Sequence, residues 1–153
     1  MAGVEAAIVA RTVRELFSSL HDGLRNQVRD LDPGTLNWRP LPKANSIAVL
    51  VTHTLGSERE MIRAVRSLSS DRDRDSEFKA EADSAELLAL IDQAQREMEQ
   101  HLGELTAEDL VELRSRKGQD PRTGLAWLIS NYGHAREHLA QIELTKQLYD
   151  SRT

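Results

Sequence analysis

Four long segments of helical periodicity limit what this chain of 153 residues can fold into more than any other feature. Their apolar residues recur at three- and four-residue steps, which places those residues on one face of a helix. The segments run from about Val4 to Arg29, from Asn45 or Ser46 to Leu68, from Ser84 to Glu104 and from Thr123 to Leu148. No segment shows the sustained alternation of a half-buried strand. The sequence therefore predicts an all-α fold, an antiparallel four-helix bundle, formed by residues 1–153 as one domain.

Residues typical of helix starts support these boundaries. Ser46 can accept a hydrogen bond from a free amide in the first turn of the second helix. Asp83 followed by Glu86 matches a capping box for the third helix. Thr106 with Asp109 predicts an additional short turn of helix before the fourth long segment.

The distribution of charge argues against nucleic acid as a partner. The chain carries 20 basic and 25 acidic side chains, which gives a net charge of −5. Residues 71–83 hold many of the acids, and the alternating acids and bases at 71–75 favour a solvated connection. Nucleic-acid-binding proteins usually show a basic face. The nearest basic cluster lies in a predicted loop without interleaved aromatic residues: Arg114, Arg116, Lys117 and Arg122.

Composition excludes further classes of protein. Because the chain has no cysteine, it has neither disulfides nor a cysteine-ligated metal, nor can it use a cysteine nucleophile of its own. No apolar run approaches the ~20 residues that cross a bilayer. We therefore expect a soluble, cytoplasmic protein without a membrane partner.

Three histidines are candidate metal ligands. His134 and His138 are four residues apart, which places their β-carbons about 5–6 Å apart on one helical face. Two imidazoles so placed can reach one metal ion. His53 lies on the second helix beside the small residues Gly56 and Ser57, which leave room for a ligand. A divalent ion held by three histidines keeps open coordination positions. On spacing alone, two histidines four residues apart are also common as ordinary surface or half-buried polar residues.

Other polar and aromatic residues are candidates for a surrounding pocket. Ser57, Trp127 and Asn131 share helical rows with the histidines, and Trp38 lies in the loop before the second helix. We interpret His21 and His101 as structural or solvated residues. Side chains that could orient imidazoles or meet an anionic substrate are the following: Glu58, Gln141, Arg59 and Arg136.

The order of these motifs resembles the DinB/YfiT-like superfamily along essentially the whole chain. The resemblance is carried by Trp38-Arg39-Pro40, by residues Ser46 to His53, and by residues His134 to His138. Members are four-helix bundles, frequently dimers, that hold a divalent metal through a histidine triad. Some are low-molecular-weight-thiol S-transferases or related isomerases, and many have no established activity. The resemblance implies that His53, His134 and His138 are the ligands here.

These observations predict a metal-dependent enzyme that performs thiol transfer or hydrolysis on a small-molecule substrate. Imidazole suits zinc, nickel, copper and iron alike, and zinc or nickel is the divalent metal that we expect first. Such an ion can lower the pKa of bound water to about 7 or deprotonate a bound thiol. Since the chain has no cysteine, the thiol would be a low-molecular-weight cosubstrate. The alternative is a non-catalytic, metal-stabilised dimeric binding or stress-response module.

A row of small residues on the last helix predicts a homodimer. Small side chains allow two helices to approach closely, and a symmetric dimer uses the same patch on both subunits. The row consists of Ala126, Ser130, Gly133 and Ala140. The alternative is that this row packs under a loop of the same chain.

Overall fold

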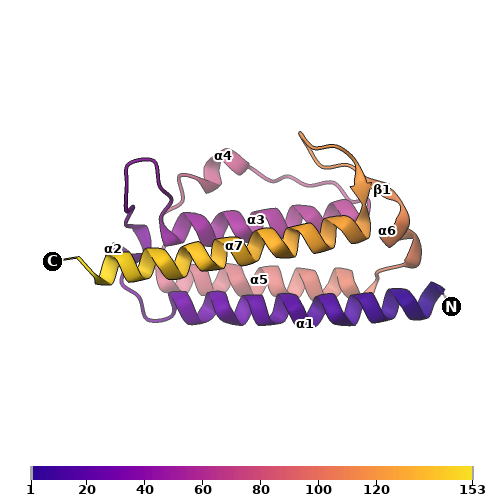
Figure 1. Ribbon diagram of the computed structural model, residues 1–153, viewed down its shortest axis with the longest axis horizontal. Coiled ribbons are helices and arrows are strands. Elements are labelled where there is room, and N and C mark those ends of the chain that lie inside the picture. The colour runs from indigo at the N-terminus through magenta and orange to yellow at the C-terminus, as the bar shows by residue number, and fades with distance from the viewer. Residues whose placement is uncertain (1, 153) are drawn as a thin grey trace.

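Four long helices form the body of the computed structural model, which describes residues 2–152 (Figure 1). They are α1 (Ala2–Val28), α3 (Ile47–Val65), α5 (Ser84–Gly103) and α7 (Gly124–Asp150). The shorter elements within that range are α2 (Pro33–Asn37), α4 (Arg74–Glu77), α6 (Ala107–Val111), β1 (Leu113–Arg114) and β2 (Arg122–Thr123). The predicted four-helix bundle is confirmed. The short antiparallel hairpin of β1 and β2 was not predicted, because two-residue strands cannot show alternation.

The long helices form a ring in which each packs against two neighbours. α3 lies beside α7 and α5, and α1 lies beside the same two helices. α1 and α7 run in one direction along the bundle, whereas α3 and α5 run in the other (Figure 1). The connection from α3 to α5, residues 66–83, therefore returns along the length of the bundle and carries α4 over α3 (Figure 1).

The helix starts follow the predicted capping residues. Ser46 accepts a hydrogen bond from the amide of Val49 and caps α3. Asp83 and Glu86 form a capping box, in which each side chain bonds the other residue's backbone amide. Thr106 and Asp109 do the same at the start of α6. These local signals were sufficient to place three helix starts.

The buried face of α1 differs from the predicted apolar stripe. Ile8 and Leu16 share the three- and four-residue spacing of the apolar positions in this segment, but they are 50% and 38% exposed. Ala6 and Ala10 lie on the buried face instead, and Phe17 is almost completely enclosed. Small residues occupy the buried positions at the start of this helix, so side-chain size did not reveal which face is buried.

The prediction of a solvated connection at residues 71–75 is wrong for Arg72. The Arg72 side chain is only 11% exposed and pairs with the buried Glu77. It also pairs with Glu60 of α3. Charged side chains that neutralise one another can be enclosed, so a charged composition alone did not indicate exposure.

Candidate metal centre

His53, His134 and His138 converge between the neighbouring helices α3 and α7. One nitrogen of each ring lies within 4.8 Å of the corresponding nitrogen of the other two. The Nε2 atoms of His134 and His138 are 3.1 Å apart, and the His53 ring centroid lies 5.6 and 5.2 Å from theirs. The packing of α3 against α7 brings His53 close to His134 and His138, which helical periodicity alone could not show. A set of three imidazoles is chemically suited to a divalent transition metal, so this cluster could hold one.

Glu77 orients the His53 ring. Its Oε2 lies 2.9 Å from Nδ1 of His53, so that a proton on Nδ1 directs Nε2 toward the cluster. Arg72 donates from Nε and Nη2 to the two oxygens of Glu77 at 2.7 and 2.8 Å. A side chain at Gly56 would overlap Oε1 of Glu77, because the carboxylate packs directly on the α3 backbone. The return connection thus supplies a support for His53 that periodicity could not reveal.

Gln141 supports His138 from within α7. Its Oε1 lies 2.8 Å from Nδ1 of His138, which again leaves Nε2 for the cluster. The sequence identified Gln141 as a residue that could orient an imidazole, and the structure places it where it can do so. Two of the three rings therefore have their tautomer and direction set by a neighbouring oxygen.

The electrostatic environment favours the neutral forms of His134 and His138. Burial, together with the nearby His138 and His53, lowers the pKa of His134 to about 4. Burial also lowers the pKa of His138. Because a metal binds the unprotonated imidazole, these rings are in the binding form at neutral pH.

The lowered pKa of His134 predicts that the metal-free protein loses stability in mild acid. The folded-state pKa is about 4, below the ordinary value of 6.5, so the unfolded chain takes up the proton first as pH falls. The free energy of unfolding should therefore decrease between pH 6.5 and pH 4. Melting temperatures of the metal-free wild type and of His134→Gln at pH 7 and pH 5 measure this, and the variant should lose less. An identical acid dependence in both proteins would contradict the prediction.

The support from Glu77 predicts that Gly56→Ala weakens metal binding without touching a ligand. Its new Cβ would displace the Glu77 carboxylate, and loss of such an outer partner typically costs about 10–100-fold in metal affinity. Competition with a chromophoric chelator measures the change. Gly103→Ala is the matched control, because a Cβ there meets nothing within 4 Å. Equal affinities of the two variants would argue against a supporting role for Glu77.

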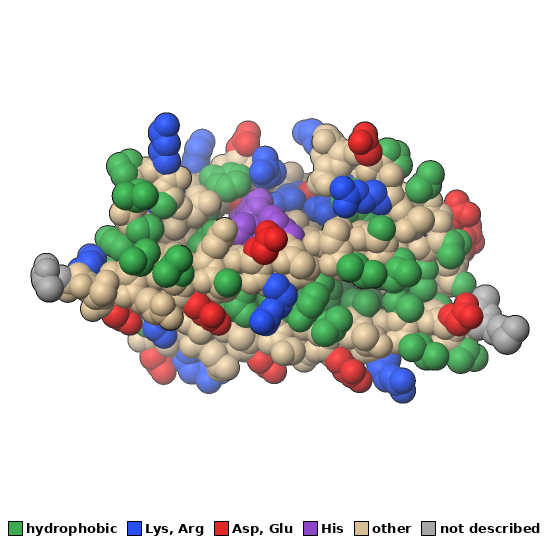
Figure 2. All heavy atoms as spheres, in the orientation of Figure 1, with side chains coloured by type: hydrophobic (Ala, Val, Ile, Leu, Met, Phe, Trp, Pro, Cys, Tyr) green, Lys and Arg blue, Asp and Glu red, His purple; other side chains and the backbone are tan. Residues whose placement is uncertain are grey.

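A cleft of about 770 Å³ adjoins the histidine cluster. The histidine side chains are visible in a hollow that Lys and Arg side chains flank (Figure 2). Three of the predicted pocket residues line this cleft: Ser57, Trp127 and Asn131. Asn131 donates to Oγ of Ser57 at 3.0 Å, and the indole Nε1 of Trp127 donates to the carbonyl oxygen of Arg114 at 2.8 Å.

Trp38, the fourth predicted pocket residue, lies elsewhere. Its ring packs against Tyr149 near the end of α7, with 5.5 Å between centroids, and the guanidinium of Arg152 lies over it. The loop that carries Trp38 therefore lies beside the C-terminal end of α7 and not beside the histidine cluster. Phe78 of the return connection is the aromatic residue beside His53, 5.0 Å away.

Several other candidates are paired away from the cluster. Glu58 forms a buried pair with His21 at 2.7 Å, and Arg59 pairs with Glu97 of α5. His101, which the sequence left as structural or solvated, is only 8% exposed. These residues contribute to the bundle and not to the histidine cluster.

Comparison of the sequence and of the fold with known proteins gives one consistent result. The profile of the DinB superfamily matches residues 12–142. No curated protein sequence matches the chain significantly.

No helix within residues 2–152 is long and apolar enough to cross a membrane.

Three solved structures share the fold at low sequence identity. A conserved protein from Enterococcus faecalis is 16% identical with a TM-score of 0.76, and the alignment covers 93% of this chain and 97% of that protein. A DinB-like protein from Bacillus subtilis is 18% identical with a TM-score of 0.72, covering 92% and 93%. A DinB-like protein from Bacillus cereus is 12% identical with a TM-score of 0.75, covering 90% and 91%. With the family profile spanning most of its length, the chain belongs to the DinB superfamily.

Proposed function

We propose that this protein is a divalent-metal-dependent enzyme that transfers a low-molecular-weight thiol to, or hydrolyses, a small-molecule substrate. The observation that carries the proposal is the convergence of three histidines at a cleft large enough for a small molecule. Zinc or nickel is the metal we propose, because both are bound well by imidazole. A divalent ion held there supplies Lewis acidity, which lowers the pKa of a thiol or of water.

The residues around the cluster would hold the reactants in place. Glu77 and Gln141 fix the direction of two histidine rings before any substrate arrives. Asn131 and Ser57 offer polar groups on the cleft wall, and the enclosed ring of Trp127 packs behind that wall. Holding two reactants in one cleft converts a bimolecular encounter into an effectively unimolecular step. Thiol transfer is our first choice, with the sulfur supplied by a cosubstrate, since the chain has no cysteine.

A panel of small thiols offered with a generic electrophile tests the proposal. Monobromobimane or a chlorinated nitroaromatic compound serves as the electrophile, with zinc-loaded and nickel-loaded protein. Turnover that requires one thiol and is abolished by chelator supports transfer. A parallel panel of ester and amide substrates tests hydrolysis, which chelator-sensitive turnover without any thiol would support. Absence of both activities in metal-loaded protein would instead favour the non-catalytic binding module.

The row of small residues on α7 remains our candidate for a dimer contact. Ser130, Gly133 and Ala140 are exposed on the single chain, and Ala126 is half-buried. We expect light scattering to give the mass of a dimer, and we expect Gly133→Glu to give a monomer because a charged side chain would separate the helices. Gly103→Glu, which adds the same charged side chain at an exposed glycine of α5, is the control. A monomeric mass for the wild type at working concentration would reject the dimer.

A further inference from the structure

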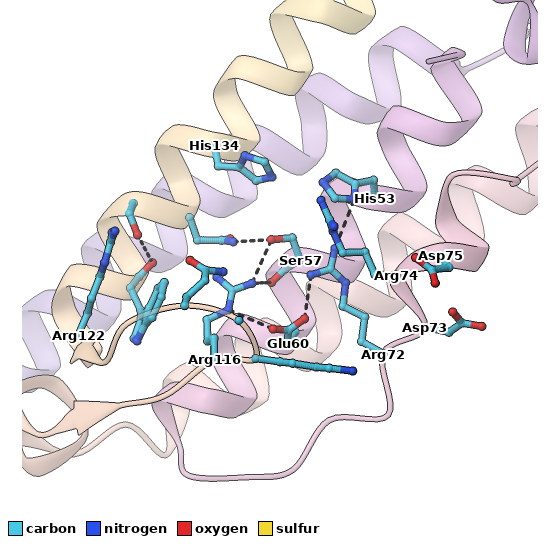
Figure 3. Close-up of a pocket in the computed structure, with 16 residues that line it drawn as sticks. His53, Ser57, Glu60, Arg72, Asp73, Arg74, Asp75, Arg116, Arg122 and His134 are labelled. Atoms are coloured by element: carbon cyan, nitrogen blue, oxygen red, sulfur yellow. Dashed lines mark hydrogen bonds and ion pairs between the residues drawn. The ribbon is translucent and has the colours of Figure 1, made fainter. Parts of the chain in front are cut away.

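The cleft beside the histidine cluster has strongly basic walls on two sides. Arg116 and Arg122 come from the β1–β2 hairpin and its loop, and Arg72 and Arg74 come from the return connection opposite (Figure 3). With Lys117, five Lys and Arg side chains line the cleft, against three carboxylates. Arg116, Lys117 and Arg122 belong to the basic cluster of the predicted loop, which has no interleaved aromatic residue in the sequence. The fold supplies an aromatic partner, because the guanidinium groups of Arg116 and Arg122 each lie 5.1 Å from the centroid of the Trp127 ring.

Arg116 is an enclosed cation with weak partners. Its side chain is only 6% exposed. Its bonds to Oε1 of Glu60 and to Ser57 are 3.3–3.4 Å long, whereas charge-assisted bonds to carboxylates are usually about 2.7–2.9 Å. Glu60 lies closer to Arg72, at 2.8 Å. Burial lowers the pKa of Arg116 despite Glu60, so its charge is incompletely compensated.

The geometry around Arg116 leaves one side of the guanidinium for a ligand. Within residues 2–152, its Nε and Nη2 make the hydrogen bonds, and Nη1 takes part in none. Trp127 holds the guanidinium plane in place, and the indole is itself fixed by its bond to the Arg114 carbonyl. A buried charge normally has a partner, and an enclosed guanidinium that opens on a cleft is suited to an anionic group.

We propose that the cleft selects a substrate that carries a carboxylate, which binds Arg116 while its reacting group faces the histidine cluster. This inference deepens the proposed function and rests on it for the identification of the cleft as a substrate site. A carboxylate fits better than a phosphate, because the lining cations exceed the lining carboxylates by only two and Glu77 also pairs with Arg72. Lys117 and Arg122 are more exposed and form the outer part of the same site.

The two tryptophans provide a built-in comparison for the test. Trp127 lies against Arg116, whereas Trp38 lies against Arg152, also at 5.1 Å, near the C-terminal end of α7. Sodium propionate is titrated into metal-free protein, after dialysis to remove chelator, and the indole N–H resonances are followed by NMR at constant ionic strength. We expect a saturable shift of Trp127 and none of Trp38. Propionamide, the neutral analogue, should shift neither resonance.

Substitutions identify the group that binds. Arg116→Gln should weaken propionate binding about tenfold or more, whereas Arg152→Gln, the matched cation over the other tryptophan, should leave it unchanged. If Arg116→Gln does not fold, the exposed Arg122→Gln replaces it, with an expected weakening of about twofold to fivefold. Unchanged binding in the variant that folds, or an equal effect of propionamide, would overturn the proposal.

The remaining outcomes separate this inference from the proposed function. Binding of inorganic phosphate but not propionate would overturn the carboxylate as the ligand class. Because the titration uses metal-free protein, direct coordination to a metal cannot produce the shift. Propionate binding at Trp127 without turnover in the thiol and hydrolysis panels would retain the anion site and reject the enzyme. Turnover without any propionate binding would retain the proposed enzyme and overturn the carboxylate site at Arg116.

Discussion

Replacing His53, His134 or His138 by alanine should lower the affinity for divalent metal by more than the factor of about 10–100 expected for an outer partner. Each substitution removes one of three converging imidazole nitrogens, and two nitrogens hold an ion far less firmly. Competition with a chromophoric chelator measures the affinity, and elemental analysis of untagged protein purified without added metal measures the metal content. His101→Ala, which changes a histidine on α5 outside the cluster, should retain wild-type metal content.

Metal removal should also destabilise the wild type and not the ligand variants. An ion that binds only the folded state stabilises it by about 2.7 kcal/mol at a hundredfold excess over its dissociation constant. Chelator should therefore lower the melting temperature of the wild type and of His101→Ala. Equal metal content in the wild type and in a variant lacking all three histidines would reject the metal centre.

The second large effect concerns the buried pair of His21 and Glu58. The two side chains are 1% and 0% exposed, and their contact crosses from α1 to α3 at 2.7 Å. Burial raises the pKa of Glu58, and the hydrogen bond with His21 is the largest influence that opposes this rise. Among the described residues, the other polar atom of each side chain has no hydrogen-bond partner. Little else would compensate the carboxyl group if the histidine were lost.

We therefore expect His21→Ala to reduce the free energy of unfolding by about 3–5 kcal/mol, as is typical when one member of a buried pair is removed. Urea denaturation measures this change. Replacing both residues by leucine should recover most of the loss, because the uncompensated polar group is then gone. Arg59→Ala, which breaks the more exposed pair with Glu97, is the control and should cost about 0–1 kcal/mol. A similar loss in His21→Ala and Arg59→Ala would show that the buried pair has no special role.

The helices and their starts were predictable because they depend on local physics. Ser46, Asp83 and Thr106 each bond an amide within three residues, so the information needed lies in a short stretch of chain. The spacing of His134 and His138 likewise fixed their common face. Bringing His53 to them required knowledge of which helices are neighbours. The resemblance to the family implied that arrangement, and periodicity alone did not.

Gln141 was identified from its spacing, but the residues that support His53 were not predictable from local patterns. Arg72 and Glu77 lie in a stretch whose alternating charges are typical of solvated connections. Their burial depends on the return of the chain across α3, which is a long-range property. Gly56 could be recognised only as a small residue, because its role depends on a carboxylate from 21 positions later in the sequence. Arg116 was recognised only as a basic loop residue, because its contact with the Trp127 ring depends on the fold.

Because the return connection supports the histidine cluster from outside the bundle, the cluster can lose that support while the bundle stays folded. Residues 66–83 are attached to α3 beside the cluster largely through ion pairs and hydrogen bonds, which involve Arg72, Glu77 and Glu60. Segments tied mainly by such contacts can open locally at a lower cost than the packed core. Opening of this segment would withdraw the carboxylate from His53 while the four long helices stay assembled. Sequence changes confined to this stretch could therefore tune how long a bound ion is retained, at little cost to folding.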